Sequence, residues 1–176
     1  RDALAACDES DDRIRRRRDY QRAGAEAQPG SLEAVLGSLR EAGVDAATGA
    51  LLAELLLKHP SVKLAAISSE TLAGEPVQQH LPRLRSDLAF CGQAELGGVD
   101  IAFLCTPHGE AASIAKKLLD DGVKVIDLAA DFRIKDIATW ERWYKMKHAA
   151  PELVAEAVYG LPEMNRGKIR GARLVA

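Results

Sequence analysis

The stretch VDIAFLCTPHGEAASIAKKLLDDGVKVIDLA, residues 99–129, decides the fold of this chain. It opens with VDIAFLCT, a nearly continuous apolar run typical of a strand buried on both faces of a parallel sheet. GEAASIAKKLLDDG then predicts a helix that Gly122 can end, with its apolar face at Ala111, Ala115, Leu118 and Leu119. A second buried strand, VKVIDLA, follows. Strand, helix and strand within about 30 residues predict one right-handed crossover unit.

The flanking segments extend this unit to a doubly wound parallel sheet of the α/β class. GALLAELLLKHP (49–60) predicts a helix stopped by Pro60, with one face made of Leu51, Leu52, Leu55 and Leu56. SVKLAAISS (61–69) and DLAF (87–90) predict strands, and ARLVA (172–176) begins another. Between them, Trp140, Trp143 and Tyr144 lie at helical spacing. Pro151 fits the first position of a helix through Val158, and YGLPEMNRG (159–167) predicts a turn-rich loop.

The beginning of the chain differs in composition from the rest. Residues 1–30 combine an acidic cluster with RIRRRR (13–18) and predict a charged, flexible N-terminal arm, which could alternatively contact RNA or an acidic partner. SLEAVLGSLREAG (31–43) predicts a helix, capped by Ser31 and closed by Gly43. We therefore expect a helical segment of unclear role over 31–47 and a Rossmann-like domain over 48–176.

Composition narrows the class of protein. The chain has 176 residues and a net charge of −2, which gives no argument for a nucleic-acid partner. Its three cysteines have no regular spacing, so we expect a reducing, cytoplasmic compartment rather than a disulfide framework. Apolar runs stay well short of about 18 residues, so no membrane span is predicted. The chain starts at Arg1 without a methionine or a signal-type apolar core, so we expect a processed start or a part of a longer chain.

Cys105 and His108 are the first candidate site residues, because a predicted buried strand ends at Cys105 and His108 follows three residues later. A metal site needs three or four ligands, and no further cysteine or histidine has a partnering spacing, so no metal is expected. A nucleophilic cysteine must lie in solvent beside its base, whereas Cys105 ends a buried strand and suits packing. The favoured interpretation is a ligand-binding loop made by Pro107, His108 and Gly109, at a helix N-terminus that favours anions.

Three other segments could contact a ligand. GVDAATGA (43–50), with Gly43, Thr48 and Gly49, is either a phosphate-binding turn or a plain helix cap. Ser68 and Ser69 could donate to a ribose 2′-phosphate, which Glu70 would oppose if it pointed inward, and the alternative is an ordinary turn. Asp131 and Arg133 follow a strand and either face a cleft or form a surface ion pair.

These residues carry a resemblance to a known family. TGALLAELLLKHP, ISSETLAGEPV, TPHG, GVKVIDLAADFRIKD, WERWYKMKHAAPELVAEAVYGLPEMNR and KIRGARLVA resemble, in order and spacing, segments of the N-acetyl-γ-glutamyl-phosphate reductases of arginine biosynthesis. The resemblance covers residues 48–176. It implies an NADPH-binding Rossmann-type domain that runs into a catalytic and substrate domain, and a cytoplasmic homo-oligomer in the full-length form.

The resemblance also implies a reaction. A cysteine thiolate attacks the acyl phosphate N-acetyl-γ-glutamyl phosphate, phosphate leaves, and hydride from NADPH reduces the thioester to the semialdehyde, with a histidine as acid and base. Gly43, Thr48, Gly49, Ser68, Ser69, Pro107, His108 and Gly109 are the expected cofactor contacts. Asp131, Phe132 and Arg133 are expected near the nicotinamide, and residues 159–163 at the domain junction.

The chain departs from the family pattern at two places. The family's glycine-rich loop resembles Gly-Ala-Ser-Gly-Tyr-Thr-Gly, where this chain has GVDAATG, and the strand before it is not recognisable. The family's nucleophile follows in an Asn-Pro-Gly-Cys segment just beyond the position of Ala176. We therefore expect weak or no NADPH binding and no catalysis by this chain alone. The alternatives are an aspartate-semialdehyde dehydrogenase-like reductase, or a non-catalytic remnant that binds partners through its basic arm.

Overall fold

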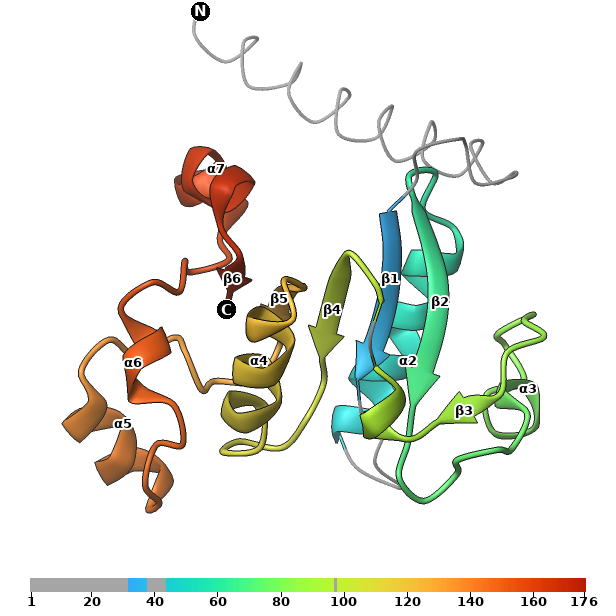
Figure 1. Cartoon of the computed structure of the whole chain (residues 1–176), viewed down its shortest axis with the longest axis horizontal. Helices are drawn as coiled ribbons and strands as arrows, with labels where there is room; N and C mark the ends of the chain where they lie inside the picture. The colour runs from blue at the N-terminus through green and yellow to red at the C-terminus, as the bar shows by residue number, and fades with distance from the viewer. Residues whose placement is uncertain (1–31, 38–43, 97) are drawn as a thin grey trace, which may run out of the picture.

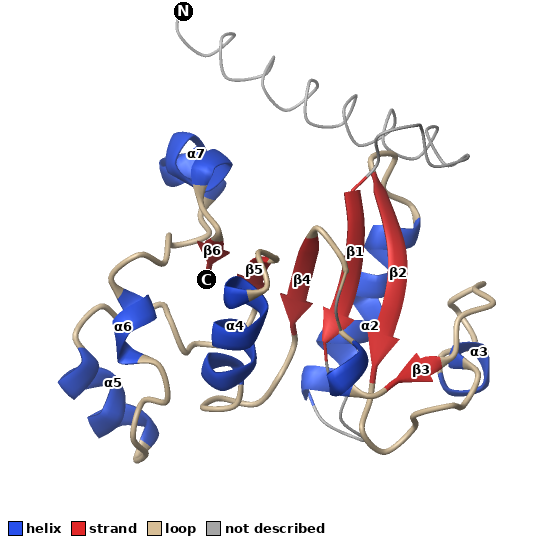
Figure 2. Cartoon of the chain, viewed as in Figure 1, coloured by secondary structure: helices blue, strands red, loops and turns tan. Residues whose placement is uncertain are grey.

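The computed structural model describes residues 32–37, 44–96 and 98–176. They form a six-stranded sheet in which every pair of neighbouring strands is parallel (Figures 1 and 2). The strand order is β3-β2-β1-β4-β5-β6. The first described strand, β1, thus lies in the middle of the sheet, and the following strands wind outward from it in both directions, which is the Rossmann order. The predicted doubly wound parallel sheet is confirmed.

The first half of the sheet winds away from β1. After β1 (Leu32–Gly37) come helix α2 (Val44–Leu57), β2 (Val62–Ser68), the single turn α3 (Val77–His80) and the edge strand β3 (Phe90–Cys91). A short 3₁₀ turn, η2 (Gln93–Glu95), follows β3. The hydrophobic core of this half of the sheet contains Ala53, Leu56, Leu64, Ile67, Val77, Leu84, Phe90 and Cys105.

The second half winds the other way from β4. It comprises β4 (Ile101–Leu104), α4 (Ala111–Asp120), β5 (Lys124–Asp127), α5 (Ile137–Tyr144), α6 (Pro151–Val154), α7 (Pro162–Gly171) and β6 (Leu174–Val175). In Figure 1, α4 lies in front of β5 and α2 lies behind β1 and β2, so the two helices cover opposite faces of the sheet. The second core includes Ala102, Leu104, Ala115, Leu118, Val125, Phe132, Val154 and Leu174.

The predicted helix over 31–43 is wrong, because Leu32–Gly37 form the central strand β1. Backbone pairing on both sides explains the difference: β1 pairs with β2 from Leu32↔Val62 onward and with β4 from Ala34↔Ile101 onward. These partners lie far along the chain and outweigh a local helical spacing. The sheet therefore begins at Leu32, inside the segment predicted to be helical. The predictions for residues 1–30 and for Gly43 concern positions outside the described residues.

The buried face of α2 also differs from the prediction. Leu51 and Leu55 are 60% and 59% exposed, whereas Leu56 is 5% exposed and Ala53 is fully buried. Gly49 is buried as well, so the face that packs on the sheet runs along Gly49, Ala53 and Leu56. Because α2 is apolar nearly all round, its composition does not single out one face, and small residues occupy the closest approach to the strands.

Two further elements near the end of the chain differ from expectation. The predicted loop 159–167 contains most of α7, which begins with Pro162 at its first position and buries none of its residues. The predicted helix through Val158 ends at Val154. Val158 instead forms a parallel bridge with Val175, and the Gly160 N–H donates to the Ala176 carbonyl at 2.6 Å. Within the described ranges, no helix is long and apolar enough to cross a membrane.

The corrected orientation of α2 can be tested with two neighbouring leucines. We expect Leu56→Ala to lower the free energy of unfolding by about 2–4 kcal/mol, because it leaves a cavity in the core. Leu55→Ala is the matched control, and its cost should stay near 0.5 kcal/mol because Leu55 lies largely in solvent. Urea unfolding of both variants measures the difference. Equal costs would contradict the described packing of α2.

Candidate functional site

The candidate site lies at the carboxyl ends of β4 and β5, where ligands bind in open α/β sheets. Two loops meet there, residues 105–110 after β4 and residues 128–136 after β5. Cys105 belongs to the core on the β2 side of the sheet, whereas Leu104 belongs to the α4 side. Cys105 is 3% exposed, and His108 is exposed. The predicted packing role of Cys105 is confirmed, and its thiol is shielded from solvent.

His108 is supported by a row of rings that contact one another in tilted or edge-on arrangements. Its imidazole centroid lies 4.9 Å from the Tyr144 ring, and Tyr144 lies 4.9 Å from Trp140. Trp140 contacts His148 at 4.7 Å, and His148 contacts Phe132 at 5.7 Å. The row runs from the buried Trp140 and Phe132 outward, and its last ring is the exposed His108.

Gly109 turns the loop into α4 with a φ of +89°, a left-handed conformation that favours glycine. A side chain here would also overlap the Met146 thioether. The Gly109 N–H donates to both carboxylate oxygens of Asp131, at 2.8 and 3.1 Å, and the Ala112 N–H donates to Asp131 Oδ2 at 3.2 Å. The helix N-terminus does attract an anion as expected, but that anion is the carboxylate of Asp131.

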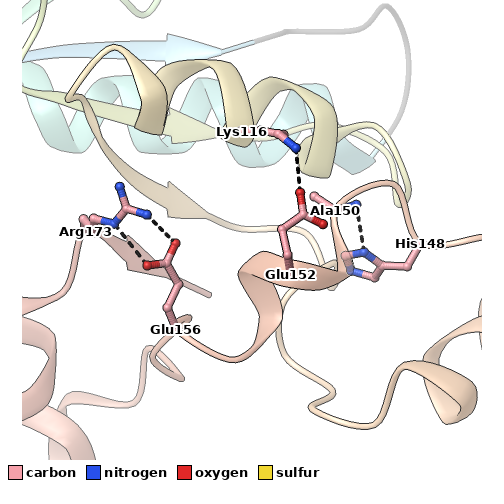
Figure 3. Close-up of polar contacts among 6 residues, drawn as sticks. All are labelled: Lys116, His148, Ala150, Glu152, Glu156 and Arg173. Atoms are coloured by element: carbon pink, nitrogen blue, oxygen red, sulfur yellow. Dashed lines mark hydrogen bonds and ion pairs between the residues drawn. The ribbon is translucent and has the colours of Figure 1, made fainter.

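Two side chains whose role the sequence did not indicate, Trp140 and His148, contact the backbone carbonyls of residues 130 and 131. Trp140 Nε1 donates to the Ala130 carbonyl at 3.1 Å, and His148 Nε2 lies 2.6 Å from the Asp131 carbonyl. The Ala150 N–H donates to His148 Nδ1 at 3.1 Å (Figure 3). Because Nδ1 accepts, the proton of neutral His148 lies on Nε2 and is donated to Asp131. The only sequence signal for this contact is that His148 opens HAAPEL, one of the resembling segments.

The predicted cleft residues occupy three different environments. Asp131 is fully buried, and Phe132 is 1% exposed within the core of the α4 face. Only Arg133 is exposed, and its guanidinium donates to the Leu128 carbonyl at 2.8 Å. The structure therefore places Asp131 beneath the 105–110 loop, which it supports through Gly109, and Phe132 in the core against the His148 ring.

The predicted residues of the first half follow the same carboxyl edge but on other strands. Ser68, the last residue of β2, and Ser69, which follows it, are fully buried. Ser69 Oγ accepts the Leu72 N–H at 3.3 Å and so closes a turn, while Glu70 Oε1 accepts the Gln93 N–H at 2.7 Å. The serines are separated from the 107–109 loop by β1, which lies between β2 and β4.

Thr48 and Gly49 lie inside α2 rather than in a loop before it, because the helix already begins at Val44. The prediction that residues 44–50 form a glycine-rich phosphate turn is therefore wrong. Any such turn would fall on residues 38–43, which lie outside the described part of the chain.

Two buried polar atoms at the same edge have no hydrogen-bond partner among the described residues. They are Thr106 Oγ1 and Asp127 Oδ2. The other oxygen of Asp127 accepts the Ala129 N–H at 2.9 Å. Burial, with a smaller contribution from the neighbouring Asp131, raises the pKa of the Asp127 carboxyl to about 7.

Surface contacts fasten the segment that carries His148 (Figure 3). Lys116 on α4 pairs with Glu152 on α6 at 2.7 Å, and Arg173 pairs through two nitrogens with Glu156, at 3.0 and 2.8 Å. All four side chains are exposed to solvent to a substantial degree, so these pairs add little stability. The first pair joins α6 to α4, and the second joins Glu156, which follows α6, to Arg173, which precedes β6.

Comparison with known proteins assigns this fold to a family. The family model described as "Semialdehyde dehydrogenase, NAD binding domain" matches residues 42–172, and the chain belongs to this family. Two solved structures share the fold: aspartate semialdehyde dehydrogenase II from Vibrio cholerae (TM-score 0.55, 16% identity, 83% of this chain and 41% of that one) and aspartate semialdehyde dehydrogenase with NADP from Candida albicans (TM-score 0.52, 19% identity, 80% and 36%).

The sequence relatives are more specific. The chain is 56% identical over 133 residues to N-acetyl-γ-glutamyl-phosphate reductase from Thiobacillus denitrificans, and 55% identical over 133 residues to the enzyme of that name from Nitrosomonas europaea. Each alignment covers 73% of this chain and 39% of the relative. The resemblance stated from the motifs is confirmed, and the chain spans about two fifths of the length of these relatives.

The raised pKa of Asp127 predicts a pH dependence of stability. The unfolded chain releases this proton near the ordinary pKa of 3.8, whereas the folded chain keeps it until about pH 7. Stability therefore falls as pH rises between these values, and the loss is complete above them. Asp127→Asn removes the charge, so its free energy of unfolding should improve relative to the parent by about 2–3 kcal/mol between about pH 5 and pH 8.

Urea unfolding of parent and Asp127→Asn at a series of pH values makes this measurement. A difference between the two proteins that stays constant with pH would show that Asp127 is ionised throughout.

Proposed function

We propose that this chain is the cofactor-binding part of an NADPH-dependent reductase. The reductase converts N-acetyl-γ-glutamyl phosphate to N-acetylglutamate semialdehyde and releases phosphate, and its full-length form is a cytoplasmic homo-oligomer. The observation that carries this proposal is the 56% identity over 133 residues to an enzyme of that name. The Rossmann strand order supports the cofactor role, because dinucleotides bind where the order reverses, here between β1 and β4.

The described residues fit a dinucleotide at this edge. Helix α2 begins at Val44, after the carboxyl end of β1, and the exposed His108 follows β4, the neighbouring strand. Bound NADPH would supply the hydride for the reduction. Pro107 and His108 would border the cofactor from the loop, whereas Asp131 supports that loop from inside.

The preference for NADPH over NADH rests on the resemblance and on the state of Glu70. An acidic side chain after β2 ordinarily accepts a hydrogen bond from the ribose 2′-hydroxyl and repels a 2′-phosphate. Here the Glu70 carboxylate already accepts the Gln93 N–H at 2.7 Å. This contact supports a site in which Glu70 is turned toward η2 rather than toward the ribose.

Neither described cysteine suits the covalent step. Cys105 is buried in the core, and burial together with the Glu95 carboxylate raises the pKa of the half-buried Cys91 thiol. A thiolate nucleophile needs the opposite, an accessible sulfur with a lowered pKa. We therefore assign the nucleophile and the acid–base histidine to the part of the relatives that this chain does not cover, and we propose that the chain alone is inactive.

Cofactor binding is the first test. We expect NADPH to bind the chain weakly, with a dissociation constant well above the submicromolar range, because residues 44–50 are helical and offer no glycine-rich turn. Titration followed by NMR should move the amide signals of residues 105–110 and leave those of α7 in place. NADH titrated in parallel measures the contribution of the 2′-phosphate.

Submicromolar binding would show that the altered segment before α2 suffices for tight binding. Signals that do not move with either cofactor would contradict the cofactor-binding role.

Cys105 gives a second test, in a longer protein that joins this chain to a catalytic domain. Cys105→Ala should keep most of the reductase activity, because the thiol is a buried packing group. Loss of a small buried side chain should cost about 1 kcal/mol of stability. Steady-state kinetics with a thermal unfolding curve separates the two effects. Abolished turnover in a stably folded variant would identify Cys105 as the nucleophile.

A further inference from the structure

We propose that Asp131 is a positioning residue, which sets the His108–Gly109 loop for the nicotinamide cofactor without touching the cofactor itself. The inference rests on the proposed function, because it assigns a role at the same site. It differs from the expectation drawn from the sequence, in which Asp131 faces the cleft as a ligand contact.

The carboxylate of Asp131 has no side open to a ligand. The residue is fully buried, and its two oxygens receive three hydrogen bonds, two from the Gly109 N–H and one from the Ala112 N–H. These donors lie 22 and 19 residues earlier in the chain, so the contact ties the loop after β5 to the first turn of α4. A carboxylate is favoured at this end of a helix by the unpaired N–H groups and the helix dipole.

Asp131 is itself held in place. Its carbonyl oxygen lies 2.6 Å from His148 Nε2, and the carbonyl of Ala130 accepts the Trp140 indole N–H at 3.1 Å. Trp140 is fully buried and His148 is 7% exposed, so neither partner can move without disturbing the core. The carboxylate therefore acts on Gly109 from a fixed point.

The same segment supports His108 from a second direction. The His108 ring packs on Tyr144 at 4.9 Å, and Tyr144 packs on Trp140 at the same distance. Backbone and ring of the loop are thus fixed by separate contacts that both lead back to Trp140. A loop held in one geometry before binding loses less conformational entropy when a ligand binds.

This arrangement also limits what the loop can bind. The N–H groups of Gly109 and Ala112 are used inside the chain, so they offer no site for a phosphate of the cofactor or of the substrate. The exposed imidazole of His108 is the group that the loop presents. Asp131 therefore affects the cofactor only through the position of His108 and Gly109.

The test uses the full chain with NADPH as the probe. Asp131→Asn keeps the size of the side chain but replaces one acceptor oxygen by an amide that cannot accept an N–H. Asp127→Asn is the matched control: Asp127 is a similarly buried carboxyl that ends β5, in the same region of the fold as Asp131, and it receives the Ala129 N–H rather than a donor near α4. A second pair, Tyr144→Leu and Tyr144→Phe, removes or keeps the ring under His108.

We expect Asp131→Asn and Tyr144→Leu to raise the NADPH dissociation constant about five- to tenfold, the effect of one lost hydrogen bond or ring contact. Asp127→Asn and Tyr144→Phe should stay within about twofold of the parent. Amide hydrogen exchange at Gly109 and Ala112 should accelerate in Asp131→Asn alone. Thermal unfolding of each variant establishes that the fold is retained.

Unchanged NADPH binding by Asp131→Asn, with faster exchange at Gly109, would overturn the positioning role and leave the proposed function intact. Equal weakening by Asp127→Asn would overturn it as well, because any buried carboxyl would then matter. A parent chain that binds neither NADPH nor NADH even at millimolar concentration would overturn the cofactor-binding role proposed for this chain, a result distinct from the other two.

Discussion

The backbone pairing of β1 with β2 on one side and with β4 on the other joins the two halves of this molecule. Each half has its own core, one beneath α2 and one beneath α4, and the central strand connects them. Because both pairings are parallel, all carboxyl ends of the strands lie along one edge of the sheet. That edge brings Ser68, His108 and Asp131 to the same side of the fold, although they are spread over more than sixty positions of sequence.

At this edge, where the motifs suggest contacts to a ligand, buried carboxyl groups accept hydrogen bonds from backbone N–H groups of the chain itself. Asp127 holds the turn that follows β5, and Asp131 holds the turn that precedes α4. The two groups differ in their surroundings: Asp131 receives three hydrogen bonds from the N–H groups of Gly109 and Ala112, while one oxygen of Asp127 has no partner among the described residues. At this edge, Asp127 and Asp131 therefore stabilise loop conformations through backbone N–H groups. The exposed side chain in the 107–109 loop is that of His108.

Much of the fold could be predicted from sequence, because residues 99–129 combine a helical periodicity with two buried apolar strands. These two strands follow one another along the chain and also lie next to each other in the sheet. β1 could not, since its pairing partners are the strands β2 and β4, which lie farther along the chain and leave no local signal in LEAVLG. At the candidate site, the place of Pro107, His108 and Gly109 after β4 could be predicted from the sequence, and their contact with a cofactor stays a prediction. The supporting roles of Trp140 and His148 depend on contacts with the carbonyls of residues 130 and 131, and backbone carbonyls carry no sequence information.

At both edges of the sheet, turn segments of the chain itself form hydrogen bonds with the outer strand. On one margin, Phe90 of β3 exchanges hydrogen bonds with Gly74 and Glu75; on the other, residues 158–160 pair with β6 through Val175 and Ala176. An open margin is a template onto which another strand can add, so covering it protects against aggregation. Here the outer ladders are already taken up along β3 and β6. Among the described residues, the outer sides of β3 and β6 are therefore closed to a strand from another molecule.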